Sequence, residues 1–220
     1  LGDSGNSVIL VGLETLAGGS GNDIVSLGNR GNTMTVSGIE TLTGGAGADV
    51  VTFTGGTGVR FQGNGGGDSV TLVTGSNTDT VVYAAATDGT DTITGFQAGT
   101  DKVSLTGTLR TALDDSGDGS LAGATRATGE ANLSTDELVV LSTTVSALSD
   151  TGFAAFRAAL GTVSGSSAGA DALVLANDGT NTGVFLVTDA NGDGTIGSDE
   201  VQLLARVNGA ILGSGDITLS

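Results

Sequence analysis

Short apolar runs, separated by glycine-rich turns, recur through the first half of the chain. The first three runs are 7–11, 13–16 and 24–27, and each suits a β-strand because it is short and rich in Val, Ile and Leu. Residues 27–52 repeat the unit without a gap, with matches at Leu1/Leu27, Gly2/Gly28, Gly5/Gly31, Asn6/Asn32, Gly12/Gly38, Glu14/Glu40, Thr15/Thr41 and Leu16/Leu42. A 26-residue unit with three strands predicts a coil of parallel β-structure with three sides.

The turns carry a nonapeptide, G-G-x-G-x-D-x-U-x with U a large apolar residue, at 18–26 and again at 44–52. Glycine tolerates positive φ, so the backbone can turn sharply and its carbonyls can converge. The aspartate adds a charged oxygen, which is the type of ligand that Ca²⁺ prefers. Aligned turn residues give three predicted columns: Asn6/Asn32/Gly58, Glu14/Glu40/Asp68 and Asp23/Asp49/Asp79. The aspartates of the third column are expected to lie one strand spacing, about 4.8 Å, apart.

Weaker copies of the turn follow. Asn64 replaces the second glycine of one copy, and in the next copy Asn77 stands at a glycine position two residues before Asp79. Asparagine adopts left-handed φ more readily than most residues, so both turns can still form. Residues 88–105 predict two strands around a turn, in which Phe96 is expected to close the open end of the apolar stack.

The nonapeptides and residues 88–105 resemble the RTX, or hemolysin-type, calcium-binding repeats of type I-secreted bacterial surface proteins. The sequence of residues 38–42 and the C-terminal segment 171–220 are most like those of calcium-dependent S-layer proteins. The resemblance implies Ca²⁺ as cofactor and a two-sided β-roll, which is the alternative to three sides. The ligands it implies are Gly18, Ser20, Asp23, Gly44, Ala46, Asp49, Gly63, Gly65, Asp68, Asn77, Asp79, Asp91 and Asp101. In the competing interpretation these Asp and Asn side chains only form turns with the backbone.

A second calcium motif lies near the end of the chain. Residues 189–200 match D-x-[DN]-x-[DN]-G-x₅-E completely. The expected ligands are the side chains of Asp189, Asn191 and Asp193, the carbonyl of Thr195 and both carboxylate oxygens of Glu200. A strand-like run precedes the loop where an EF-hand has a helix, so we predict a structural site on a β-scaffold. Paired EF-hands are not implied.

The second half of the chain has a different composition. We predict an RTX-type calcium-binding β-solenoid over 1–107 and a β-rich capping and secretion region over 108–220, which contains the EF-hand-like loop. One helix is predicted, at 149–161. Strands are predicted at 138–141, 172–176 and 183–188, whereas 201–207 suits a helix or a strand.

Residues 114–121 imitate the start of another calcium loop. Position twelve of that loop would be Thr125, which cannot supply a bidentate carboxylate. The sequence therefore favours a solvated turn here over a weak metal site.

Charge narrows the classes of partner. The net charge is −17, from 24 acidic and 7 basic residues, which argues against nucleic acid and favours divalent cations. No apolar run is long enough to span a membrane. The chain has no cysteine and no histidine, so G-x-S-x-G at 165–169 lacks its usual general base and we do not predict an enzyme.

The predicted fold is therefore all-β: a right-handed parallel β-solenoid or β-roll with calcium-binding turns, then a smaller β-rich region with one helix. The expected function is a calcium-dependent structural protein of the bacterial cell surface, an S-layer or matrix component that folds and assembles outside the cell. The alternative is the terminal, non-catalytic RTX module of a secreted adhesin or hydrolase. The expected partners are the type I secretion apparatus, other copies of the chain through its sheet edges, and cell-surface polysaccharide. The chain starts at Leu1 and is expected to be part of a longer one.

Overall fold

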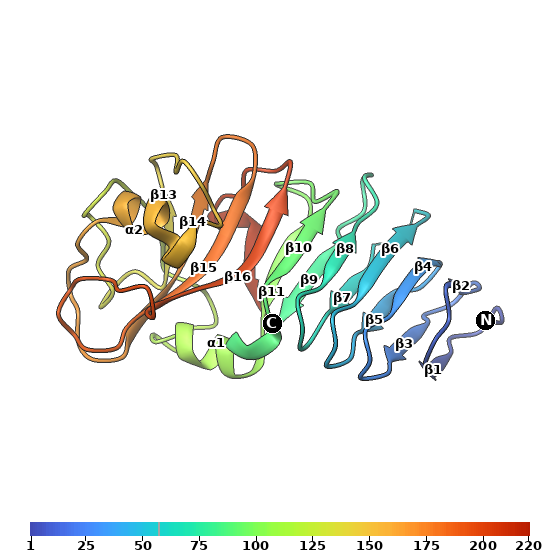
Figure 1. Cartoon of the computed structure of the whole chain (residues 1–220). Helices are drawn as coiled ribbons and strands as arrows, with labels where there is room; N and C mark the ends of the chain where they lie inside the picture. The colour runs from blue at the N-terminus through green and yellow to red at the C-terminus, as the bar shows by residue number, and fades with distance from the viewer. Residues whose placement is uncertain (57) are drawn as a thin grey trace.

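The strands of the first half alternate between two sheets. In the computed structural model, which describes residues 1–56 and 58–220, consecutive strands step along the molecule from the N-terminus (Figure 1). Sheet A contains β1 (Ser7–Leu10), β3 (Ile24–Leu27), β5 (Thr41–Thr43), β7 (Arg60–Gln62), β9 (Thr80–Tyr83) and β11 (Lys102–Leu105). Sheet B contains β2 (Thr15–Ala17), β4 (Thr33–Ser37), β6 (Val50–Thr54), β8 (Ser69–Thr71) and β10 (Asp91–Thr94). All neighbouring pairs among these strands are parallel, which is consistent with a β-roll.

The three-sided coil is therefore wrong, and the two-sided alternative describes the structure. Ser7 pairs with Ile24, and Ile24 pairs with Thr41, so one full turn in the first coils takes 17 residues. A 26-residue unit contains three strands, which is one and a half turns. Equivalent residues of the two sequence copies consequently lie in opposite sheets.

The core lies between the two sheets, because alternate residues of each short strand point inward. Val51 and Phe53 of β6 are buried, while Thr52 between them faces outward. Phe53 meets Phe61 of sheet A edge to face, with ring centroids 6.1 Å apart. The part of the chain from β1 to β11 is called the roll. One row of large apolar side chains from each sheet therefore fills its interior.

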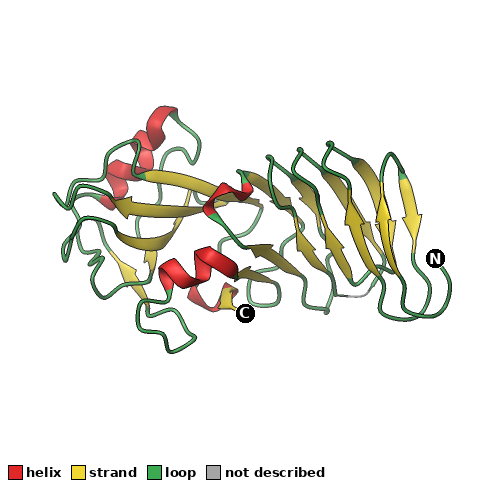
Figure 2. Cartoon of the chain, turned by 90° about the horizontal axis from the view of Figure 1, so that it is seen from below, coloured by secondary structure: helices red, strands yellow, loops and turns green. Residues whose placement is uncertain are grey.

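The second half extends both sheets (Figure 2). Its elements are η1 (Ala86–Asp88), α1 (Gly107–Leu113), β12 (Gly123–Arg126), β13 (Leu138–Leu141), η2 (Thr151–Phe153), α2 (Ala154–Leu160), β14 (Ala170–Asn177), β15 (Thr182–Asp189), β16 (Val201–Asn208), η3 (Ser214–Asp216) and β17 (Ile217–Leu219). Sheet B continues from β10 through β16, β15, β14 and β13 to β12, with antiparallel pairing only around β15. The strand at 138–141 and the hairpin over 172–188 are confirmed, and 201–207 is a strand.

The structure has two α-helices in its described part where the sequence predicted one. The predicted helix 149–161 begins as η2, with left-handed Gly152 inside it, and becomes α2 only from Ala154. The missed helix, α1, buries Leu109 and Leu113, which are four residues apart on one face. The polar residues around this pair hid its helical spacing.

The chain returns to complete one more coil. β16 pairs in parallel with β10, and β17 pairs in parallel with β11. Asp91 pairs with Ala205 and Val103 with Ile217, so β16 and β17 follow β10 and β11 at one constant spacing in sequence. Phe96 is buried in the roll but does not close the stack, since this last coil lies beyond it.

Candidate calcium-binding sites

Turn residues, most of them with carboxylate side chains, form two columns along the two edges of the roll. Column A consists of Asn6, Asp23, Glu40, Val59, Asp79 and Asp101, and column B of Asn32, Asp49, Asp68 and Asp91. In each column the acid of one coil accepts the backbone N–H of the column residue one coil earlier, with the exception of the step from Glu40 to Val59. In column B the three bonds are 2.8, 2.8 and 2.9 Å long. These side chains therefore connect successive coils.

The sequence assigned the acids to the wrong columns. Asp23 and Asp49 precede strands of opposite sheets, so they do not stack on each other. Asp79 lies next to Asp101 instead, since its N–H donates to Asp101 Oδ1 at 2.9 Å. Glu40, which sequence analysis left out of the ligands, accepts the N–H of Asp23 at 2.8 Å. The 17-residue spacing of Asn6, Asp23 and Glu40 was the signal for the true column.

The nonapeptide glycines are needed for close contact between coils more than for positive φ. Of the three in the first copy, only Gly21 has a positive φ, of 126°. A Cβ on Gly18 would lie 1.7 Å from the carbonyl oxygen of Gly38 in the next coil. A Cβ on Gly19 would lie 2.2 Å from the carbonyl oxygen of Gly2 in the coil before. The pair of glycines therefore admits a neighbouring backbone on both sides.

The hydrogen bonding of the turn aspartate differs between the consensus and the degenerate turns. In the consensus turns the second oxygens of Asp23 and Asp49 accept the N–H groups of Gly19 and Gly45, at 3.0 and 3.1 Å. In the degenerate turns the Oδ2 atoms of Asp68 and Asp79 are buried without a hydrogen-bond partner. A buried carboxylate oxygen without a donor is strongly destabilising unless a cation or proton meets it. Each of these two oxygens, one in each column, is therefore available to a cation.

Burial also shifts the protonation of column B. Burial, with help from neighbouring carboxylates, raises the pKa of Asp68 to about 6 and that of Asp91 to about 7. Tyr83 of sheet A extends toward them, and burial raises the pKa of its hydroxyl well above the usual value. In column A burial also raises the pKa of Asp79, whereas the side-chain N–H of Asn6 lowers that of Asp23.

The remaining predicted ligands of the roll are backbone or amide groups. The turns with Gly44 and Ala46 and with Gly63 and Gly65 follow each other at the edge of column B, while Gly18 and Ser20 lie at the edge of column A. Asn77 donates its side-chain N–H to the carbonyl of Gly56. Within residues 1–56 and 58–220, no three His, Cys, Asp or Glu side chains converge as a metal site. A calcium ion in the roll would therefore need carbonyls beside one or two carboxylates.

The loop 189–200 is closed by internal hydrogen bonds to the first and last acids of the motif. Asp189 accepts N–H groups from Gly192 and Gly194, at 2.7 and 2.8 Å. Glu200 accepts those of Ala190 and Gly197, at 2.9 and 2.7 Å. Burial alone would raise the pKa of Asp189, but these bonds together hold it below its usual value. The first and last acids of the motif thus face the same loop interior.

The side chains of the intermediate positions are exposed and turn back on the loop. Asn191 and Asp193 each accept the N–H two residues on, at 2.8 and 2.7 Å, the second from Thr195. Val163 donates its N–H to the carbonyl of Gly194 at 3.0 Å, which holds the loop against the segment before β14. The donor set is all oxygen, as calcium requires.

The loop 114–121 has a feature that sequence analysis missed. Glu137, buried just before β13, accepts the N–H groups of Ser116 and Ala122, at 2.9 and 2.7 Å. Asp118 accepts the N–H of Ser120 at 2.8 Å, as Asp193 does from Thr195. A glutamate from outside the loop thus occupies the place that Thr125 cannot fill. Both of its oxygens accept backbone N–H groups, as the two oxygens of Glu200 do.

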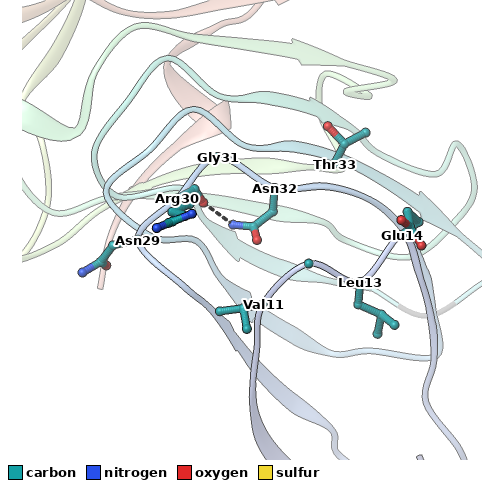
Figure 3. Close-up of a pocket in the computed structure, with 9 residues that line it drawn as sticks. Val11, Leu13, Glu14, Asn29, Arg30, Gly31, Asn32 and Thr33 are labelled. Carbon is teal, nitrogen blue, oxygen red and sulfur yellow. Dashed lines mark hydrogen bonds between the residues drawn. The ribbon is translucent and has the colours of Figure 1, made fainter.

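A hollow of about 750 Å³ lies beside the first two coils, next to Asn32 at the N-terminal end of column B (Figure 3). Val11, Leu13, Glu14 and Arg30 line it, and Asn32 donates to the carbonyl of Arg30 at its edge. Its one acid and one base do not form a cation site.

Comparison with known families agrees with this geometry. The family model described as Peptidase M10 serralysin C terminal matches residues 2–138, which is more than half of the chain. No curated protein matches the chain. Among the described residues no helix has the length and apolar character to cross a membrane. The chain belongs to the serralysin C-terminal family, the RTX-type calcium-binding β-roll region of secreted proteins.

Proposed function

We propose that this chain is a calcium-dependent structural module of the bacterial cell surface, an S-layer or matrix component, and not an enzyme. Its turns bind calcium outside the cell, and calcium binding completes its folding. The observation that carries the proposal is that one carboxylate oxygen in each column, Oδ2 of Asp68 in column B and Oδ2 of Asp79 in column A, is buried without a hydrogen-bond partner.

Charge balance supports a cation in the columns. The ion pairs found among the described residues, Arg126–Asp136 and Arg206–Asp178, lie outside both columns. Without a counter-ion, the stacked carboxylates repel one another by about 1–4 kcal/mol per pair, depending on screening. Calcium would remove this repulsion and satisfy the unpartnered oxygens.

The residues that would hold calcium are the column aspartates, with carbonyls of the neighbouring turns. In the second half of the chain they are Asp189, Asn191, Asp193, Thr195 and Glu200. The ion would act as a counter-charge and a link between coils, and no chemical step is assigned to it. Type I export fits this role, because a chain that needs calcium to fold stays unfolded where calcium is scarce.

Assembly is the part of the proposal that distinguishes a surface layer from a soluble module. Within residues 1–220, β1 and β2 are the outermost strands of the two sheets on the N-terminal side, and Ile9 and Val11 are 80% and 76% exposed. Edge strands with apolar side chains are templates for pairing with another chain. The hollow beside them adds apolar surface (Figure 3). Self-association through these edges, with cell-surface polysaccharide as a further partner, is what the S-layer role requires.

A second candidate is the non-catalytic tail of a secreted hydrolase. The observation that favours it is the matching family, which is described by its occurrence at the C-terminus of a peptidase. The terminal module of an adhesin is the third candidate and shares the same calcium chemistry.

Calcium addition tests the proposal. Far-UV circular dichroism should show β-structure in millimolar calcium and lose most of it in chelator, and light scattering should show calcium-dependent assembly. The same β-signal in both solutions would contradict the calcium function. Assembly that is unchanged after deletion of residues 1–26 would place the contact elsewhere. A monomer at all calcium concentrations would favour the tail of a hydrolase.

A further inference from the structure

The calcium loop 189–200 is the turn of a hairpin. Asp189 is the last residue of β15, and Glu200 directly precedes β16. The N–H of Thr188 donates to the carbonyl of Glu200 at 2.9 Å, which closes the base of the loop. The two acids at the ends of the motif therefore fix how β16 leaves the loop.

β16 also belongs to the roll. It pairs in parallel with β10 over Asp91–Thr94, and the Thr90 hydroxyl donates to the carbonyl of Leu203 at 2.7 Å. Gln202 donates its side-chain N–H to the carbonyl of Ala86. The part of β16 that meets the roll is buried, with Ala205 and Val207 inaccessible to solvent. One strand thus joins the calcium loop to the last coils, as Figure 1 shows for β15, β16 and β10.

The roll end of this strand pair is also a candidate calcium ligand. Asp91 lies opposite Ala205, and its Oδ1 accepts the N–H of Asp68 at 2.9 Å. β10 would be an edge strand with unpaired backbone groups if β16 were absent. Ordering β10 next to column B and ordering β16 after the loop are therefore parts of one event.

We propose that the loop 189–200 acts as a clasp: calcium bound there holds β16 against β10, and the loop and column B bind calcium with positive cooperativity. The proposal rests on the calcium function proposed above. Ordering the eight residues of β16 costs conformational entropy, and the first site to bind meets that cost for the second. Because such coupling is reciprocal, column B should strengthen the loop as much as the loop strengthens column B. Couplings of this kind change affinity by about 5- to 150-fold.

The chain carries its own reporter for column B. Tyr83 is its one tyrosine, and the chain has no tryptophan. The ring is buried between the sheets, and its pKa is raised in part by the Asp91 carboxylate. Tyrosine fluorescence during a calcium titration therefore follows the roll, while calorimetry counts all sites.

Glu200→Gln removes the bidentate ligand of the loop and leaves the roll sequence intact. We expect calorimetry to show one site fewer and the Tyr83 transition to move to at least fivefold higher calcium. Asp199→Asn is the matched control, because it removes the same charge from an exposed neighbour that is not an expected ligand. It should leave both readouts unchanged. If Glu200→Gln does not fold at saturating calcium, Glu200→Asp gives the same comparison with the charge kept.

Thr90→Val tests the connection itself. It removes the hydroxyl bond to Leu203 and retains every proposed ligand. In this background the effect of Glu200→Gln on the Tyr83 transition should shrink. Loss of one calorimetric site with an unchanged Tyr83 midpoint would overturn the clasp while leaving calcium binding in place. Absence of calcium binding by the wild-type chain would instead refute the proposed function.

Discussion

Replacing Asp91 with asparagine should stabilise the calcium-free fold and weaken the calcium-bound one. The asparagine Oδ1 can still accept the N–H of Asp68, so the bond between coils survives. What disappears is a buried negative charge and, in calcium, one candidate ligand. The same substitution therefore changes stability in opposite directions in the two solutions.

The size of the calcium-free effect follows from the pKa. Burial raises the pKa of Asp91 from 3.8 to about 7, so ionising it in the fold at pH 8 costs on the order of 4 kcal/mol. Between these two values the folded state binds more protons than the unfolded one, so stability falls as pH rises. Asp91→Asn should remove the part of this slope that Asp91 contributes and gain about 2–4 kcal/mol at pH 8 without calcium, while Asp68, whose pKa is about 6, keeps its own part. Below pH 3.8 the Asp91→Asn variant should be little more stable than the wild type, because Asp91 is protonated in both the folded and the unfolded state.

Urea denaturation followed by Tyr83 fluorescence measures this, in chelator and in millimolar calcium. An osmolyte such as TMAO can bring a weakly folded calcium-free state into range. Asp199→Asn serves again as the exposed-charge control. A variant that is less stable than wild type in chelator at pH 8, or one that keeps the wild-type pH slope, would refute the account of column B.

Two further substitutions, one of them with a control variant, test the close approach of the coils and the edge of sheet B. Gly89→Ala should lower the free energy of unfolding with calcium by about 2–4 kcal/mol in thermal denaturation, because its Cβ would lie 1.3 Å from the carbonyl oxygen of Gly66. Gly99 has a similar positive φ but open space around it, so the control Gly99→Ala should cost only about 1–2 kcal/mol. Asp136→Asn should cost about 1–3 kcal/mol in urea unfolding at pH 7, because it breaks a two-bond contact with Arg126. The Arg126 guanidinium lowers the pKa of Asp136, so this difference should hold above about pH 4 and vanish as pH falls further.

The sequence by itself determined the local chemistry of the chain. Glycine pairs and β-branched runs specify tight turns and short strands, because these preferences depend on neighbouring residues alone. The fixed spacing of oxygen ligands identified the loop 189–200, and the nonapeptides placed Asp23 and Asp49 in turns. The same local signals predicted β13 and the two strands of the hairpin, β14 and β15.

Only the tertiary structure decided which elements lie side by side. The 26-residue repeat is real, but whether three strands make one turn or one and a half depends on backbone pairing between coils. That pairing uses the same N–H and C=O groups in every strand, so side chains give little indication of the partner. The same reason hid the return of β16 to β10 and the position of Glu137 beside residues 114–121. These contacts join residues distant in sequence, and local periodicity holds no information about them.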